Sequence, residues 1–115
     1  MAQTRLKFAE SWTAAGILKD SERALEPVYA TELGVLFNDD CLSVLRLIRS
    51  EVVDTVFADP PFNLGKQYGD AVDDERPEHE YLDWCHTWID ECIRVLQPGG
   101  TLFLYNIPRW NLPLG

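Results

Sequence analysis

The residues best placed to do chemistry are Asp59-Pro60-Pro61-Phe62, which directly follow the apolar run Val53–Ala58. Prolines lack a backbone N–H, so the tetrapeptide cannot continue a sheet ladder, yet its carbonyls stay free to accept hydrogen bonds. An ionised Asp59 also only accepts, and Phe62 adds a flat ring beside these acceptors. Such a cluster suits a planar group that carries an NH₂, for example an exposed nucleobase amino group. The structural alternative is a loop that merely ends a strand, with Phe62 in the core.

Two further polar groups stand at the ends of predicted strands, namely Asn38-Asp39-Asp40 and Asn106. In open parallel sheets, ligands bind beyond the carboxyl ends of the strands. We therefore expect both groups to lie at the same sheet edge as residues 59–63. Either Asp39 or Asp40 is expected to cap the helix that follows, and the other is a candidate to face a ligand.

These polar groups require strands and helices that alternate along the chain. Apolar runs predict strands at residues 33–37, 53–58 and 101–105. Apolar residues at helical spacing predict helices over 41–48 and 78–96. Strand, helix, strand, helix, strand is the order of an α/β fold with a parallel sheet and right-handed crossovers. Because its run is mostly apolar, we expect strand 53–58 to be covered on both faces.

The remaining segments carry weaker patterns. Residues 1–30 have helical composition with poor periodicity, and we interpret them as a helical N-terminal extension before a domain at 31–115. Residues 59–77 are predicted to form an irregular acidic loop. Gly99-Gly100 closes a helix and precedes a strand, so it is interpreted as a turn, since a phosphate-binding glycine loop has to open a helix.

Composition excludes several classes of protein. The 115 residues carry a net charge of −9, and their ten Lys and Arg are scattered, which argues against a basic surface that grips nucleic acid. No run of 18 apolar residues exists, so we expect no membrane span. Cys41, Cys85 and Cys92 form no CxxC pair, which predicts neither a zinc site nor a disulfide framework, and fits a reducing cytoplasm.

The stretch DPPF after an apolar strand resembles the [DNS]PP[YFW] motif of amino-methyltransferases that use S-adenosyl-L-methionine. Together with NDDCLSVL upstream and PGGTLFLYN downstream, it is similar to the N-terminal part of site-specific DNA methyltransferases in which this motif precedes the glycine motif. The resemblance covers residues 33–111. It implies a partial Rossmann-like fold of the S-adenosylmethionine-dependent methyltransferases, with parallel strands near 33–37, 53–58 and 101–105.

The resemblance also implies roles for individual residues. Catalysis would fall to Asp59, Pro60, Pro61 and Phe62: the Asp59 carboxylate and the Pro60 carbonyl accept from the target amino group, and Phe62 stacks on a base flipped out of DNA. Binding of S-adenosyl-L-methionine would fall to Asp40, near its adenine end, and to Asp59. No metal is implied.

One departure from the family pattern is informative, because no FxGxG motif occurs in the chain. We expect that motif, and the region that makes most of the DNA contacts, to lie beyond Gly115. The chain is therefore interpreted as an N-terminal fragment that is inactive by itself. Strands left without neighbours present open edges, which predicts self-association.

Three readings of the activity remain open. Adenine N6 is favoured over cytosine N4 as the target, because position 59 is an acid rather than a serine. An RNA base or a protein glutamine amide would also meet the motif. The third reading is a non-catalytic or decayed methyltransferase segment that needs a partner.

Overall fold

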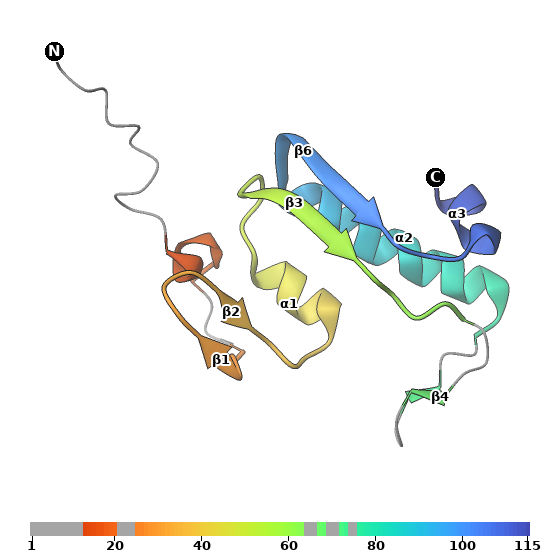
Figure 1. The fold of residues 1–115 in the computed structure, drawn as a ribbon, viewed down its shortest axis with the longest axis horizontal. Helices are drawn as coiled ribbons and strands as arrows, with labels where there is room; N and C mark the ends of the chain where they lie inside the picture. The colour runs from red at the N-terminus through yellow and green to blue at the C-terminus, as the bar shows by residue number, and fades with distance from the viewer. Residues whose placement is uncertain (1–12, 21–24, 64–66, 69–71, 74–75) are drawn as a thin grey trace, which may run out of the picture. The chain divides into compact units, whose positions relative to one another are not determined.

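The computed structural model describes residues 13–20, 25–63, 67–68, 72–73 and 76–115 (Figure 1). The chain divides into two compact units, residues 1–49 and 50–115, and each is described by itself. The division into an extension at 1–30 and a domain at 31–115 stays a prediction. Among the described residues, no helix is long and apolar enough to cross a membrane.

The first unit contains a 3-10 helix, η1, at Ala14–Ile17, and the helix α1 at Cys41–Leu47. Between them, β1 (Tyr29–Ala30) and β2 (Val35–Leu36) form an antiparallel pair. The helical extension predicted over 1–30 lies largely outside the described residues, and η1 is the helical element of its described part.

The strand predicted at 33–37 exists as β2, but it pairs antiparallel with β1 instead of joining a parallel sheet. A short turn explains this pairing. The Thr31 N–H donates to the Gly34 carbonyl at 2.8 Å, and the Thr31 hydroxyl oxygen accepts from the N–H groups of Leu33 and Gly34 at 3.2 and 3.1 Å. A hairpin closed this locally needs little loop-closure entropy, so it forms without a long-range partner.

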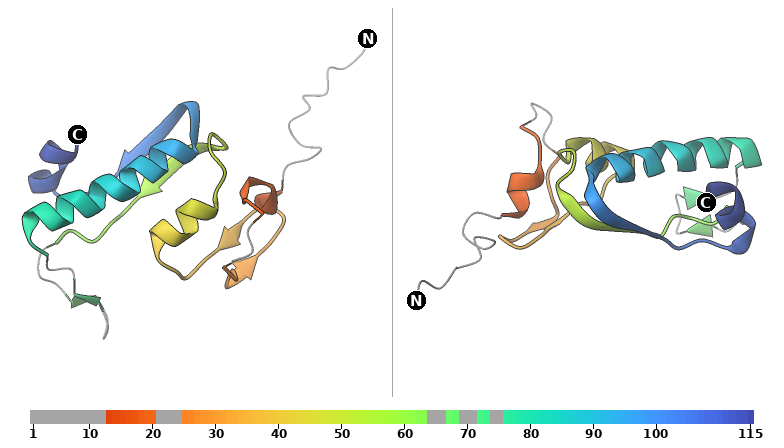
Figure 2. Two further views of the ribbon diagram at one scale, coloured as in Figure 1. Left: turned by 180° about the vertical axis from the view of Figure 1, so that it is seen from behind. Right: turned by 90° about the horizontal axis from the view of Figure 1, so that it is seen from above.

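The second unit is built on two parallel strands, β3 (Val53–Ala58) and β6 (Leu96–Leu104), joined through the helix α2 (Glu78–Val95). α2 lies along one face of the strand pair, as the edge-on view in Figure 2 shows. The strand–helix–strand order and the parallel pairing confirm the predicted α/β class. The strands predicted at 53–58 and 101–105 are the two that pair.

α2 is held to the sheet by one apolar stripe. Its buried residues recur at steps of three and four, so they share one face of the helix. They are Tyr81, Cys85, Trp88, Cys92 and Val95. Glu78 and Glu80 lie in the first turn, where negative charge complements the helix dipole.

The turn predicted at Gly99-Gly100 is part of β6. Val53 pairs with Leu96 but Thr55 pairs with Thr101, so the ladder is interrupted between these two pairs. Gly99 adopts a φ of 83°, which glycine tolerates best, and this lets the chain bend within the strand. β6 therefore begins five residues before the predicted strand.

The expectation that strand 53–58 is covered on both faces is not met. Phe57 of β3 pairs with Phe103 of β6, and the two residues are 69% and 54% exposed. Side chains alternate between the faces of a strand, so these rings lie on the face opposite the more buried Val56 and Leu102. Within this unit, α2 covers one face only.

Two further elements complete the unit. β4 (Gln67–Tyr68) and β5 (Val72–Asp73) form an antiparallel pair in the segment predicted to be irregular, of which 64–66, 69–71 and 74–75 lie outside the described residues. A last helix, α3 (Pro108–Leu114), was not predicted. It begins with a proline, which has the backbone angle of a first helical turn.

Candidate active site

β3 and β6 end side by side, and this places two of the predicted polar segments at one sheet edge. Ala58 pairs with Leu104, and the N–H of Tyr105 donates to the Ala58 carbonyl at 2.9 Å. Asp59 and Asn106 then leave the sheet at the same edge. The expected convergence is thus found for these two segments, which belong to the same unit.

A buried tyrosine connects the two segments. The Tyr81 hydroxyl, on α2, donates to the Pro61 carbonyl at 2.6 Å and accepts from Asn106 Nδ2 at 3.0 Å. Tyr81 is only 1% exposed. Asn106 is itself held, because its Oδ1 accepts from the Ile107 N–H at 2.8 Å.

A buried tryptophan holds the next carbonyl of the turn. Trp110, on α3, donates from Nε1 to the Phe62 carbonyl at 2.6 Å and is fully buried. Its ring centroid lies 4.8 Å from that of Tyr81, and the Arg109 guanidinium lies 4.5 Å over the ring. Two consecutive carbonyls of the turn therefore receive donors from two different helices.

The acceptors that precede these carbonyls are open. Asp59 is exposed and Pro60 is half-buried. Among the described residues, no donor contacts the Asp59 carboxylate or the Pro60 carbonyl. The turn thus divides into an anchored half, at Pro61 and Phe62, and a half whose acceptors are available, at Asp59 and Pro60.

The Phe62 ring is intermediate between the core and solvent. It is half-buried, and its centroid lies 5.7 Å from that of Tyr105 at a tilt of 53°. Tyr105 is 60% exposed. The ring therefore keeps surface on which a planar group can pack, and stacking on a base stays a prediction.

The exit from the turn is fixed by a side-chain amide. Asn63 Nδ2 donates to the Arg76 carbonyl at 2.9 Å, and the Arg76 N–H donates to Asn63 Oδ1 at 2.6 Å. Asn63 has a φ of 54°, a left-handed conformation that asparagine adopts more readily than most residues. This two-bond bridge closes the segment between residues 63 and 76.

In the first unit, the structure decides which aspartate caps α1. Asp40 is the N-cap, and its Oδ2 accepts from the Ser43 N–H at 3.1 Å and from the Ser43 hydroxyl at 3.2 Å. Asp39 is exposed and takes no part in the cap. Both cap bonds end on one oxygen of Asp40, so the other oxygen remains for a ligand, and a role in cofactor binding stays a prediction. Partial burial raises the pKa of the Cys41 thiol, and the Asp40 carboxylate raises it further.

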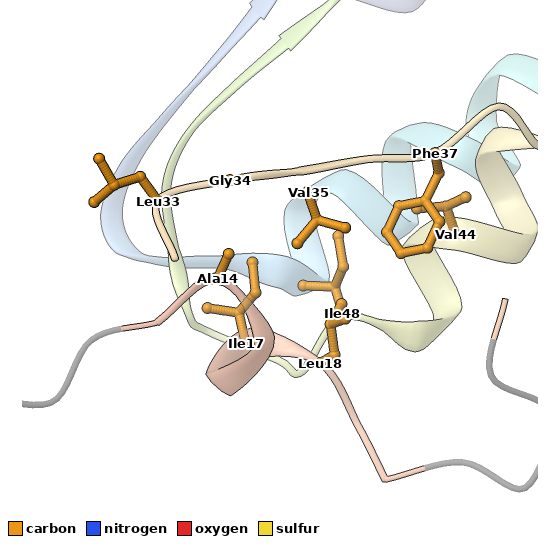
Figure 3. A pocket seen from close by; sticks show the side chains of 9 residues that line it. All are labelled: Ala14, Ile17, Leu18, Leu33, Gly34, Val35, Phe37, Val44 and Ile48. Carbon is orange, nitrogen blue, oxygen red and sulfur yellow. The ribbon is translucent and has the colours of Figure 1, made fainter. Parts of the chain in front are cut away.

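A cavity of about 230 Å³ lies within the first unit (Figure 3). Its walls are apolar, with Ile17, Val35, Phe37 and Ile48 among them. No charged or polar side chain lines it, so it offers nothing to orient a polar ligand. Neither Asp39 nor Asp40 belongs to its walls.

Sequence reasoning missed Tyr81 and Trp110 as site residues. Tyr81 lies on the buried stripe of α2, but the spacing of apolar residues says nothing about the hydrogen bond of its hydroxyl. The available signal was the residue type, because a tyrosine or tryptophan in a core usually finds an acceptor for its O–H or N–H. Which acceptor it finds depends on residues 20 and 48 positions away along the chain.

Comparison with known proteins places the chain among DNA methylases. A family model described as DNA methylase matches residues 53–110, which include the turn and both of its anchors. The chain is 54% identical over 92 residues to the Type II methyltransferase M.BamHI of Bacillus amyloliquefaciens, which covers 80% of the chain and 22% of that protein. It is 36% identical over 85 residues to the DNA adenine methyltransferase YhdJ of Escherichia coli K12, covering 74% of the chain and 28% of YhdJ.

A third relative is the Type II methyltransferase M.HpaI of Haemophilus parainfluenzae, 37% identical over 70 residues, or 61% of the chain and 22% of M.HpaI. No solved structure matches the chain. The chain thus spans between a fifth and a third of the length of these relatives. Since the family match extends over half of its residues, the chain belongs to the DNA methylase family.

Proposed function

We propose that this chain holds the target amino group during S-adenosylmethionine-dependent methylation of DNA, with adenine N6 as the target rather than cytosine N4. Membership in the DNA methylase family supports the reaction class. The similarity to YhdJ, a DNA adenine methyltransferase by name, supports adenine. An acid at position 59 also favours adenine, as inferred from the family motif.

The observation that carries the proposal is the division of the DPPF turn. The carbonyls of Pro61 and Phe62 are occupied by internal donors at 2.6 Å each. The Asp59 carboxylate and the Pro60 carbonyl receive none from the described residues. An amino group has two N–H donors, so two adjacent open acceptors on a rigid turn match it in number and polarity.

These acceptors can promote attack by the nitrogen. Hydrogen bonds from both N–H groups to Asp59 and Pro60 fix the nitrogen and leave its lone pair directed away from them. Positive charge that develops on the nitrogen is stabilised by the Asp59 carboxylate and the Pro60 carbonyl dipole. S-adenosyl-L-methionine would supply the methyl group, with its sulfur as the leaving group. The methylated nitrogen would then have to lose one proton, which the hydrogen-bonded Asp59 carboxylate could accept. Because the reaction is a single displacement, correct positioning is a large part of the catalysis.

The acceptor set fits the methyl donor in part. S-adenosyl-L-methionine supplies a methyl group activated by a sulfonium cation. Exposed carboxylates suit a cationic ligand, and the family resemblance assigns Asp40 and Asp59, which are both exposed, to the binding of this donor. The chain has no FxGxG loop for the methionine part, so these two residues account for only a portion of a cofactor site.

Methyl transfer from labelled S-adenosylmethionine to unmethylated duplex DNA tests the proposal. The protein is expressed from its complete reading frame, and the DNA is digested to nucleosides for mass spectrometry. We expect N6-methyladenine from the wild type and none from Asp59→Asn. The melting temperature of that variant should not change, because Asp59 is exposed and unpartnered among the described residues.

Asp54→Asn is the matched control, because it removes another exposed carboxylate, which lies within β3, and should leave transfer intact. N4-methylcytosine in place of N6-methyladenine would overturn the choice of base. Transfer by Asp59→Asn at the wild-type rate would overturn the role of Asp59, and no transfer by the wild type would overturn the function itself.

A further inference from the structure

The DPPF turn has few backbone N–H groups with which to form hydrogen bonds within itself. Pro60 and Pro61 have no N–H, so neither residue can donate to a neighbouring carbonyl and tighten the turn. The turn therefore has to be held through its carbonyls, by donors that come from elsewhere. A site that aligns a nitrogen for displacement needs such support, because an error of about 1 Å costs on the order of 100-fold in rate.

Two buried side chains supply this support. The Tyr81 hydroxyl donates to the Pro61 carbonyl and the Trp110 indole donates to the Phe62 carbonyl, each at 2.6 Å. Tyr81 is 1% exposed and Trp110 is fully buried, so water does not compete strongly for either donor. Asn106 donates to the Tyr81 hydroxyl at 3.0 Å, which orients the hydroxyl proton toward the turn.

We propose that Tyr81 is a positioning residue for methyl transfer, which holds the DPPF turn together with Asn106 and Trp110. The open acceptors of Asp59 and Pro60 are thereby kept where they can bind the two N–H groups of the target amine. This inference rests on the proposed function. Tyr81 is buried in α2, and it would act through the Pro61 carbonyl and not on the reacting atoms.

The ring and the hydroxyl of Tyr81 contact different partners, so packing and positioning can be tested separately. Its ring packs against Trp84 and Trp110, with centroids 6.0 and 4.8 Å away. Its hydroxyl is the part that contacts the turn. Tyr81→Phe keeps the ring and removes the hydroxyl, so it removes the support while leaving most of the packing in place.

The first measurement does not depend on enzymatic activity. NMR relaxation dispersion at the backbone amides of Phe62 and Asn63 reports microsecond-to-millisecond motion of the turn. In Tyr81→Phe we expect new exchange at these two amides, with the amides near Ile93 in the last turn of α2 unchanged. Tyr29→Phe is the control, since it removes the hydroxyl of an exposed tyrosine of the first unit and should behave as the wild type.

The second measurement is steady-state methyl transfer by the complete protein. We expect Tyr81→Phe to lower kcat by about 10- to 100-fold and to change the KM for S-adenosylmethionine little, because the lost hydroxyl contacts the Pro61 carbonyl and neither Asp40 nor Asp59. If Tyr81→Phe only destabilised the fold, the fraction of active protein would fall, but no new exchange would appear at Phe62 and Asn63. Wild-type kcat in Tyr81→Phe overturns the positioning role.

A second variant keeps the inference testable if Tyr81→Phe folds poorly. Asn106→Asp replaces the Nδ2 donor by an oxygen, which attracts the Tyr81 hydroxyl proton away from the Pro61 carbonyl. The same exchange at Phe62 and Asn63 is expected. Unchanged turn dynamics in both variants would show that the turn does not need this support, whereas absence of transfer by the wild type would count against the proposed function alone.

Discussion

Gly100 occupies a crowded point of the strand pair, and its replacement by alanine gives a sharp test of the packing. An added Cβ would lie 2.9 Å from the Gln97 carbonyl oxygen, 2.9 Å from Leu96 Cδ2 and 3.0 Å from the Asp54 carbonyl oxygen. The leucine methyl can rotate away. The two carbonyls belong to the backbone of β6 and β3, so they move only if the register of the parallel pair is disturbed.

The cost follows from two opposing effects. Overpacking a well-filled site typically costs about 1–3 kcal/mol. Replacing glycine by alanine restricts the unfolded chain and returns about 0.4–1 kcal/mol. We therefore expect Gly100→Ala to lower the free energy of unfolding by about 1–2 kcal/mol. With a urea dependence near 1 kcal/mol per molar for a small domain, the midpoint should fall by about 1–2 M.

Urea unfolding followed by tryptophan fluorescence measures this shift, since Trp84, Trp88 and Trp110 all lie in the same unit as Gly100. Gly34→Ala is the control, because no atom lies within 4 Å of its added Cβ and its φ is not in the left-handed region. Its midpoint should match the wild type or rise slightly. An unchanged midpoint for Gly100→Ala would refute the crowding described here.

Three other predictions concern the site, the thiols and association. Phe62→Ala should weaken binding of the target base by about 1–3 kcal/mol, measured by DNA titration. Its loss of stability should be well below the roughly 3–5 kcal/mol that removal of a core phenylalanine costs. A large loss of stability with unchanged binding would place the ring in the core. Asp40→Asn should lower the pKa of the Cys41 thiol and speed its alkylation at neutral pH, because it removes a charge that disfavours the reactive thiolate. Cys85 is buried, and burial raises its pKa, so it should react only after unfolding. Equal alkylation rates of Cys41 in the wild type and in Asp40→Asn would contradict this. Phe103→Lys should reduce concentration-dependent self-association in sedimentation, since Phe103 is 54% exposed on the open face of a two-stranded sheet, and undiminished association would point to another surface.

The sequence alone determined the strands and the helix that carry the turn. The apolar run at 53–58 and the helical periodicity from Tyr81 to Val95 are local patterns, and each reports which face of its element is buried. The order of these elements predicts a parallel pair, because a strand–helix–strand connection leads back to a neighbouring parallel strand. The chemistry of Asp59 and the two prolines could also be inferred, since it depends only on which groups those residues have.

The tertiary structure decided matters that depend on distant partners. β2 joined a nearby antiparallel strand, because a four-residue turn supported by Thr31 closes more easily than a long-range connection. Asp40, not Asp39, became the cap of α1, a choice that rests on the reach of one carboxylate to the Ser43 N–H. The local spacing of apolar residues predicts neither the pairing of β2 nor the choice of Asp40 as the cap.

The support of the DPPF turn is the clearest case of a feature that only folding reveals. Tyr81 lies 20 residues from Pro61, and Trp110 lies 48 residues from Phe62. The sequence predicts that a buried hydroxyl or indole N–H will find an acceptor, but it does not predict which acceptor. The choice is made when α2 and α3 pack beside the end of β3, because hydrogen bonds form only within about 3 Å and packing alone brings these atoms that close.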